Sequence, residues 1–285
     1  MNENRAQLDD GQDSGLRVHN DSSSQSSLGA STSRAKRIPR EELRTRVLDA
    51  AQEMLADGGI SVGLHHLNME ELIRRVGVPR SSAFAAFGGK DELLTELMLR
   101  MLEPRGPHAL GYSPGAREVA ADVFTRHADL LTRPDGTPDP DGAARVLQEA
   151  IRLSLARNVA DTTRSSEWRT YMALSVSVES LPPNQQPRVR AALQAAETRF
   201  LEQMAELYRS AMEPLGRRPV DGLTWMQIAA VGASVVEGMA SKRLIGITEA
   251  DGSVERPGID GAPAQWELTA LAFAAVLEGL TRPVA

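Results

Sequence analysis

The sequence predicts an all-α protein, with a small N-terminal three-helix domain followed by a larger helical bundle. Aromatic residues make up only 4% of the 285-residue chain, so few segments show the alternating pattern that a sheet requires. Apolar residues recur instead at the three- and four-residue spacing of amphipathic helices. Clusters of Gly and Pro separate these segments and mark the ends of the predicted helices.

Composition narrows the classes of protein to which the chain can belong. The absence of cysteine excludes disulfides, thiolate catalysis and cysteine-based zinc sites. The formal net charge is −6, so contact with a polyanion would depend on a local basic patch. The longest apolar runs, Ile228–Val236 and Leu268–Leu277, hold about ten residues, half of the roughly 20 that a membrane span needs. The polar N-terminus lacks the apolar centre of a signal peptide, and we expect a cytoplasmic protein without a membrane partner.

The N-terminus changes abruptly in character. Residues 1–33 are rich in Ser, Asp, Asn and Gln. They are predicted to form a disordered tail, because they hold too little apolar surface to offset the entropy of ordering. The segment that follows is either a solvated charge run or an arm that neutralises nucleic-acid phosphates. Its basic side chains are Arg34, Lys36, Arg37, Arg40 and Arg44.

Local signals predict four helices after this basic segment. The first runs from Glu41 to Ala56 and ends at glycines. Asn68, with Glu71 three residues later, resembles a capping box that starts a second helix of about two turns. Gly77 ends this second helix.

The third helix begins at Pro79, whose missing N–H is tolerated at a first helical position. Gly88 and Gly89 end it, and Lys90 opens a fourth helix. Two short helices joined by a Gly-containing turn have the spacing of a helix-turn-helix, in which the second helix enters the DNA major groove. Helix pairs of this spacing also occur in folds that bind no DNA.

Three stretches of this region resemble the TetR family of transcriptional repressors. They read RVLDAAQEMLADGG, ELIRRVGVPRSSAFAAF and GGKDELL, and the resemblance covers about Arg44 to Leu102. It implies that Lys90 contacts a phosphate and that Asn68 and Met69 lie beside the DNA backbone. The recognition helix would carry Arg80, Ser81, Ser82 and Phe84.

The recognition helix also departs from the family pattern. Phe84 stands where the family usually has a Tyr whose hydroxyl binds a phosphate, and Ala85 and Ala86 leave little for base-edge hydrogen bonds. Phe87 is expected in the core, whereas Phe84 suits either the core or the DNA face. The preceding loop, Ile60–Leu67, is slightly longer than usual. DNA binding would therefore depend more on the basic arm, on Arg80 and on DNA shape.

A Pro- and Gly-rich boundary near residues 104–115 separates the DNA-binding domain, 34–103, from a helical effector-binding and dimerisation domain, 104–285. The second domain is predicted to be a helical bundle without strands. Its expected helical segments are 115–133, 141–160, 163–181, 186–213, 222–245 and 263–281.

The TetR resemblance implies a small-molecule effector pocket between the central helices of this bundle. Polar contacts could come from Arg152, Glu179, Arg199 or Gln203. Aromatic and Met residues at helical spacing are also what an ordinary core contains, so both readings stay open. The candidate lining residues are Trp168, Tyr171, Met172, Met204 and Tyr208.

The last two long helices have apolar faces with many small residues, which allow helices to approach closely. In the family, the corresponding helices form a four-helix bundle with a second subunit, and a monomer core is the alternative. A two-fold dimer also suits a palindromic operator. The candidate interface residues are Trp225, Ile228, Val235, Met239, Leu268 and Leu271.

Enzyme motifs are missing from the sequence: there is no G-x-G-x-x-G after a strand, no Walker A sequence, no H-E-x-x-H and no G-x-S-x-G. The adjacent His65 and His66 would diverge by roughly 100° on a helix, which suits no single metal site. We therefore expect no enzyme, cofactor or metal. The expected function is that of a ligand-responsive repressor, a homodimer that binds a palindromic operator in double-stranded DNA. The alternative is an interaction protein of the same fold that acts on another regulator.

Overall fold

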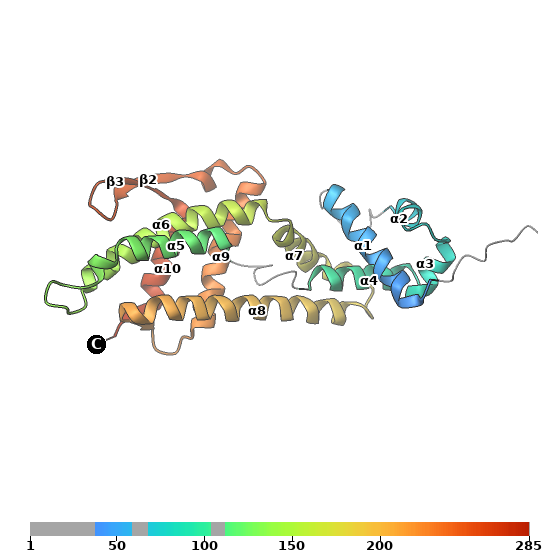
Figure 1. Cartoon of the computed structure of the whole chain (residues 1–285), viewed down its shortest axis with the longest axis horizontal. Helices are drawn as coiled ribbons and strands as arrows, with labels where there is room; N and C mark the ends of the chain where they lie inside the picture. Colours follow the sequence, from blue (N-terminus) through green and yellow to red (C-terminus); the bar gives the residue numbers. More distant parts are fainter. Residues whose placement is uncertain (1–37, 59–67, 104–111, 285) are drawn as a thin grey trace, which may run out of the picture. The chain divides into compact units, whose positions relative to one another are not determined.

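The computed structural model describes residues 38–58, 68–103 and 112–284, and these are mainly helical, which confirms the all-α fold (Figure 1). The predicted tail, most of the basic arm (Arg34, Lys36 and Arg37), the loop before Asn68 and most of the predicted linker lie outside these ranges. Within these ranges, no helix is both long enough and apolar enough to cross a membrane.

Four helices form the N-terminal part: α1 (Arg40–Gly58), α2 (Met69–Val76), α3 (Arg80–Phe87) and α4 (Lys90–Met101). Asn68 caps α2 as predicted, and its Oδ1 accepts hydrogen bonds of 3.1 Å from the N–H groups of Glu70 and Glu71. The Glu71 carboxylate bonds Arg75. Gly77 ends α2 with a left-handed φ of 71°, a conformation that suits glycine.

Pro79 corrects a detail of the prediction, because it is the N-cap of α3 and not its first residue. Its carbonyl accepts the first intrahelical bonds, from the N–H groups of Ser82 and Ala83. The helix then packs on α1 and α4. Phe87 is the main anchor, with only 3% of its surface exposed, and its predicted place in the core is confirmed. The buried side chains that surround this packing include Val47, Ala51, Leu72, Leu93 and Leu97.

The helical body begins at α5 (Pro114–Arg126) and continues through helices α6 to α10. Short 3₁₀ turns extend several of the helices, among them Ala128–Leu131 after α5 and Val178–Ser180 after α7. Helix α9 packs on both α6 and α8, and α10 packs on α6 and α9 (Figure 1). The remaining helices are α6 (Pro140–Arg164), α7 (Ser166–Ser177), α8 (Gln186–Met212), α9 (Trp225–Leu244) and α10 (Leu268–Leu280).

Four short strands correct the prediction of a body without strands. Strand β1 (Arg217–Pro219) pairs antiparallel with β4 (Thr281–Pro283), and β2 (Ser253–Pro257) pairs antiparallel with β3 (Pro263–Glu267). The predicted helix from 263 therefore begins only at Leu268.

The reason for this difference lies in the β2–β3 hairpin. Pro257 faces Pro263 at its end, and Gly261 adopts a φ of 81° in the connecting turn. Burial along β3 is uneven, and Trp266 is its one buried side chain, packed with the α10 core. The Pro-Gly-Ile-Asp-Gly stretch before β3 was a turn signal that favours such a hairpin.

A shared core joins α4 to the body. Met98 and Leu102, at the end of α4, are buried with Leu174 of α7 and with Val189 and Leu193 of α8. Arg188 of α8 and Glu92 of α4 form an ion pair beside this core. The helix that follows the helix-turn-helix is therefore packed directly against two helices of the body.

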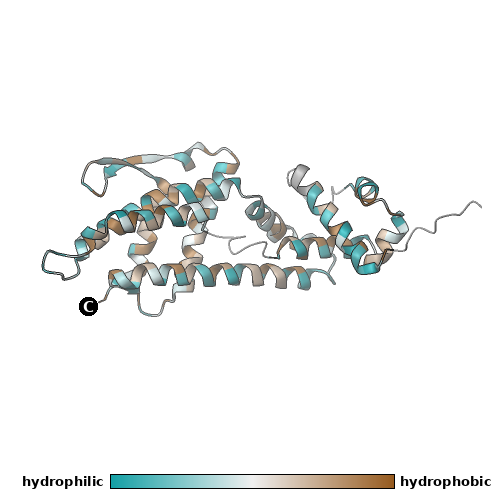
Figure 2. Cartoon of the chain, viewed as in Figure 1, coloured by the Kyte–Doolittle hydropathy of each residue, from teal (hydrophilic) through white to brown (hydrophobic). Residues whose placement is uncertain are grey.

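Helices α9 and α10 are less polar than the rest of the body. Helices α9 and α10 are coloured mainly in apolar and neutral shades in Figure 2, whereas the β2–β3 hairpin is largely hydrophilic. The inner faces of α9 and α10 fill a core with α6 and α8.

Candidate nucleic-acid interface and body cavity

The start of α3 presents polar side chains to the surface. Arg80, Ser81 and Ser82 are exposed, whereas Ala83 is buried. This division follows from the helical period, which turns the small and aromatic residues inwards and leaves the first turn outside. Neither Pro79 before α3 nor Gly89 before α4 supplies a side-chain cap. The N–H groups in the first turns of α3 and α4 therefore have the arrangement that binds anions at helix N-termini.

Phe84 is half-buried and serves as a platform for Arg80. The Arg80 guanidinium carbon lies 5.4 Å from the centroid of the Phe84 ring, within the range of a cation–π contact. Its Nη1 is 3.9 Å from a carboxylate oxygen of Glu70. The sequence left open whether Phe84 lies in the core or on the surface proposed to face DNA. The ring does both in part, since it is half-buried and also carries the exposed Arg80.

Lys90 is exposed as the first residue of α4, in a position to meet a phosphate. Met69 requires a correction, because its side chain is buried with 8% exposure and cannot extend towards a DNA backbone. Asn68 is exposed, but its Oδ1 is committed to the cap of α2.

Arg40 and Arg44 of the expected basic arm lie in α1 and bind α3. The carbonyl of Ala86 accepts hydrogen bonds from Arg40 Nε at 2.9 Å and from Arg44 Nη1 at 3.0 Å. This carbonyl is in the last turn of α3, where intrahelical donors run out, and positive charge is favourable there.

Arg44 is further fixed by an ion pair with Glu96 of α4 and by the Phe87 ring, 4.9 Å from its guanidinium carbon. The assignment of Arg44 to a DNA-binding arm is therefore corrected, since its side chain is 23% exposed and already paired. The partners lie 42 and 52 residues away, and no local spacing in the sequence could indicate them.

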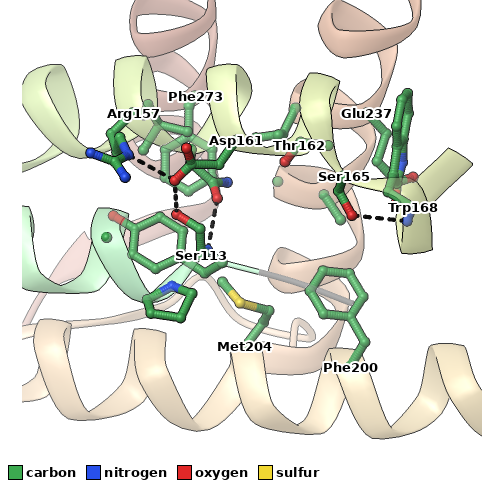
Figure 3. Close-up of a pocket in the computed structure, with 18 of the residues that line it drawn as sticks. Ser113, Arg157, Asp161, Thr162, Ser165, Trp168, Phe200, Met204, Glu237 and Phe273 are labelled. Carbon is green, nitrogen blue, oxygen red and sulfur yellow. Dashed lines mark hydrogen bonds and ion pairs between the residues drawn. The ribbon is translucent and has the colours of Figure 1, made fainter. Parts of the chain in front are cut away.

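A cavity of about 460 Å³ opens among α5, α6, α7, α8, α9 and α10 (Figure 3). Trp168, Tyr171, Met204 and Tyr208, four of the expected lining residues, are brought together on its wall. Met172 is not among its lining residues and packs instead beside Val159, Trp168 and Ala240. The prediction for Met172 is corrected for this reason.

One side of the cavity carries a hydrogen-bonded polar cluster (Figure 3). Ser113 Oγ donates to Asp161 at 2.6 Å, and Arg157 Nε donates to the same carboxylate at 2.8 Å. Asn158 Oδ1 accepts the Ser113 N–H at 3.0 Å. Burial alone would raise the pKa of Asp161, but the hydrogen bonds from Ser113 and Arg157 hold it below its usual value.

The other side carries two carboxylates in apolar surroundings. Glu237 of α9 and Glu197 of α8 both line the cavity. Burial, reinforced by the charge of Glu197, raises the pKa of Glu237 to about 7. Burial and the interaction with Glu197 also raise the pKa of Tyr171. Trp168 lies beside Glu237 (Figure 3) and partly offsets the rise, although its buried Nε1 makes no hydrogen bond of good geometry.

The polar residues expected in the pocket lie elsewhere. Arg152 binds Glu149 and the carbonyl of Gln265, and Glu179 pairs with Arg190. Arg199 and Gln203 are exposed and do not line the cavity.

Sequence reasoning missed the two glutamates of the cavity. One signal was present: Glu237 is the only ionisable residue between Trp225 and Ser241. A single charge in so apolar a helix indicates either an exposed face or a functional cavity.

The candidate dimer residues divide into two groups. Ile228 has no exposed surface within the single chain, so its assignment to an interface is corrected. Trp225, Val235, Met239, Leu268 and Leu271 are partly exposed. On the outer face of α9, Val231 is 43% exposed and a Cβ on Gly238 would meet nothing within 4 Å.

The described residues offer no arrangement for a metal ion. In the part of the chain that the structure describes, no group of three or more His, Cys, Asp or Glu residues is arranged to hold a metal ion. His65 and His66 lie outside that part.

Helices α2 and α3 and the turn between them have the arrangement of a helix-turn-helix, and a comparison with known families matches this region. The model of the bacterial regulatory proteins of the tetR family matches residues 47–97, which include α2, the turn and α3. Over this segment the chain matches the tetR family of bacterial regulatory proteins. A comparison with curated proteins gave no match.

Several solved structures resemble the chain loosely. A TetR-family transcriptional regulator from Rhodococcus sp. is 14% identical, with 84% of this chain and 98% of that chain covered and a TM-score of 0.39. Reduced NemR of E. coli is 16% identical (85% and 99% covered, TM-score 0.40). NalD of Pseudomonas aeruginosa, the secondary repressor of the MexAB-OprM multidrug efflux pump, is 16% identical (85% and 98%, 0.37). The superpositions are loose, and the family assignment rests on residues 47–97.

Proposed function

We propose that the protein is a transcriptional repressor that binds a palindromic operator as a homodimer and releases it when a small molecule occupies the body cavity. The observation that carries this proposal is the exposed start of α3, with Arg80, Ser81 and Ser82 outside and Ala83 and Phe87 anchored inside. It lies within the segment that matches the tetR family.

Contacts at the DNA would divide into positioning and reading. Lys90 and the uncapped first turns of α3 and α4 suit phosphates, which set the register of the protein on the duplex. Ser81 and Ser82 can bond either a phosphate or a base. Arg80 is the side chain long enough for a bidentate bond to guanine, the commonest specific contact in the major groove. The predicted arm (Arg34, Lys36, Arg37) would add phosphate contacts before α1.

Dimerisation through the outer faces of α9 and α10 would supply the second recognition helix. Val231 and the open surface at Gly238 lie on that face of α9, and Ala272 and Ala275 are exposed on α10. Apolar and small exposed residues of this kind favour close packing of helices. A two-fold dimer would hold the two α3 helices about 34 Å apart, one turn of DNA.

A path from the cavity to the DNA-binding helices supports ligand response. Tyr171 of α7 lines the cavity and also packs against the core that contains Met98 and Leu102 of α4. A ligand that changes the position of Tyr171 would therefore shift α7 against α4. The shift in DNA affinity is limited to the difference in ligand affinity between the two states of the protein.

Selection of DNA from a random pool tests the proposal, with wild type, Arg80→Ala and Arg145→Ala compared. Arg145 is an exposed arginine of α6 on the body and serves as the matched control. We expect wild type and Arg145→Ala to enrich the same palindrome. Arg80→Ala should lose about 1–3 kcal/mol of binding and its preference at one base pair of each half-site.

Two outcomes would contradict the proposal. Enrichment without sequence preference, falling steeply with salt, would mean that the basic segment binds DNA and α3 does not read it. No enrichment even at low salt would favour the alternative of an interaction protein that acts on another regulator.

A further inference from the structure

The body cavity concentrates the aromatic residues of a chain that has few of them. Six of its eleven aromatic side chains (three Trp, three Tyr and five Phe in the whole chain) line this one space. They come from four different segments, so a single helical stripe does not explain the cluster. Its members are Tyr112, Trp168, Tyr171, Phe200, Tyr208 and Phe273.

Gly232 keeps part of this aromatic wall in place. A Cβ at Gly232 would lie 2.8 Å from the Phe273 ring and 2.9 Å from the Tyr208 hydroxyl, closer than real Cβ contacts allow. The two rings are 5.8 Å apart with their planes at 73°, an edge-to-face pair. The cavity therefore has a packed aromatic floor, formed by Tyr208 of α8 and Phe273 of α10 beside Gly232 of α9, to which a flat or bulky apolar ligand could bind.

The charges on the wall are unbalanced. Arg157 is the single cation among the lining residues, and it is bonded to Asp161 on one side of the space. Glu197 and Glu237 form no ion pair with any cation in the described part of the chain. Their carboxylates are close enough for each other's charge to matter. The cavity thus holds two partly buried carboxylates whose mutual repulsion no described cation offsets.

We propose that this cavity binds a lipophilic organic cation, with its positive centre at Glu197 and Glu237 and its apolar groups against Trp168, Phe200 and Phe273. The proposal deepens the ligand-responsive function proposed above and rests on it for its regulatory meaning. A cation would neutralise the two carboxylates, and the aromatic faces would attract it through their quadrupoles. An anion would meet the same carboxylates with unfavourable charge. A neutral ligand would leave both carboxylates without a positive charge to neutralise them.

A matched pair of ions tests the charge preference directly. Tetraphenylphosphonium and tetraphenylborate have nearly the same size and shape and opposite charge. Calorimetric titration of the full-length protein should show binding of tetraphenylphosphonium and none of tetraphenylborate. Benzyltriethylammonium, a smaller cation, covers the case in which four phenyl groups exceed the space. Equal or tighter binding of the anion, or no binding of either cation, would overturn the proposal.

Two isosteric variants locate the site. Glu237→Gln and Glu197→Gln should each weaken binding of the cation by at least about tenfold, because each removes one of the two charges that face it. Glu202→Gln is the matched control, since Glu202 is exposed on the same helix as Glu197 and does not line the cavity. Unchanged affinity in the first two variants, or an equal loss in all three, would contradict the assignment.

The pH dependence gives a readout that a structural role would not produce. A bound cation favours the ionised form of Glu237, whose pKa is about 7 in the empty protein, so affinity should rise between about pH 6 and pH 8. Glu237→Gln should remove this slope, and persistence of the slope in the variant would argue against the site. Three tyrosines around the cavity, Tyr112, Tyr171 and Tyr208, have raised pKa values, and Asp161 has a lowered one, so none of the four changes charge in this range. Glu197 and Arg157 are the other charged residues that line the cavity.

Failure of the cation site and failure of the regulator function can be told apart. Cation binding is measured on the protein alone, and DNA selection is measured without cation. If the cation binds and no operator is found, the site stands and the regulator function fails. If an operator is found and no cation binds, the regulator function stands and the proposed ligand class is wrong.

Discussion

The helices that we propose to face DNA and the body cavity are built in opposite ways. At α3 the functional side chains are exposed, and all lie within one short segment between Asn68 and Lys90. In the cavity the lining residues run from Tyr112 to Phe273 and are largely buried. The comparison teaches that charge is managed differently at the two places: by solvent and nearby partners at the DNA face, and by burial in the cavity.

Arg44 is the point at which this comparison is easiest to break, because it is a charge beside α3 whose side chain is only 23% exposed. Arg44→Ala would leave Glu96, whose side chain is only 16% exposed, without its partner and would remove one donor from the Ala86 carbonyl. We expect a loss of about 2–3 kcal/mol in the free energy of unfolding. Chemical denaturation measures it, and DNA affinity should fall in parallel as α3 loses its brace.

Arg46→Ala is the matched control for this variant. Arg46 lies two residues further along α1 and forms an exposed pair with Glu42, of the kind worth about 0.5 kcal/mol or less. If the two variants destabilise the protein equally, the bond between Arg44 and α3 contributes nothing, and the contrast between buried and exposed charges is wrong.

Glu237 tests the other half of the comparison, the effect of burial on a charge in the cavity. Its folded pKa of about 7 lies above the ordinary glutamate value of 4.5, so the folded state holds this proton more tightly than the unfolded state. The stability linked to that proton is fully present below about pH 4.5 and is lost as the pH rises through 7. Without ligand, Glu237→Gln should therefore be more stable than wild type by about 1–2 kcal/mol at pH 8. The stabilities of the two proteins should become similar near pH 5. Thermal denaturation measures both across this pH range, and a stability difference that does not change with pH would show that Glu237 is not buried as described.

Phe84 gives the smallest and most local effect. Phe84→Tyr adds a hydroxyl to a half-buried ring that already carries Arg80, and the hydroxyl could bond a phosphate while the ring remains. We expect DNA affinity to increase by about 0.5–1.5 kcal/mol, the net value of one hydrogen bond. Fluorescence anisotropy on the selected operator measures it. Phe84→Leu is the control that removes the cation–π contact, and it should weaken binding; a gain with both variants would exclude a role for the ring in orienting Arg80.

Local signals in the sequence were enough for the helix-turn-helix. Asn68 and Gly77 are read from neighbours within four residues, and the structure confirms both ends of α2. Gly88 ends α3 with a φ of 86°, again as its position predicted. These features need only the preferences of the backbone and of caps, which act over one turn of helix.

The cavity was only partly accessible to the same reasoning. Trp168, Tyr171 and Tyr208 were found, because long apolar side chains near the middle of a bundle have few other places to go, whereas Phe200 of α8 was missed. Glu197 and Glu237 were not found, since they lie 40 positions apart on different helices, and nothing local indicates that they meet. The β2–β3 hairpin was missed because the apolar run of α10 extends the helical pattern backwards over β3.

By itself, the sequence determined the helical class, the ends of the short helices and the exposed start of α3, because these depend on interactions between residues a few positions apart. Only the tertiary structure decided that Arg40 and Arg44 cap α3, that Met69 and Ile228 are buried, and that two glutamates share one cavity. Each of these depends on which helix faces meet, and that choice is made by the packing of the whole core.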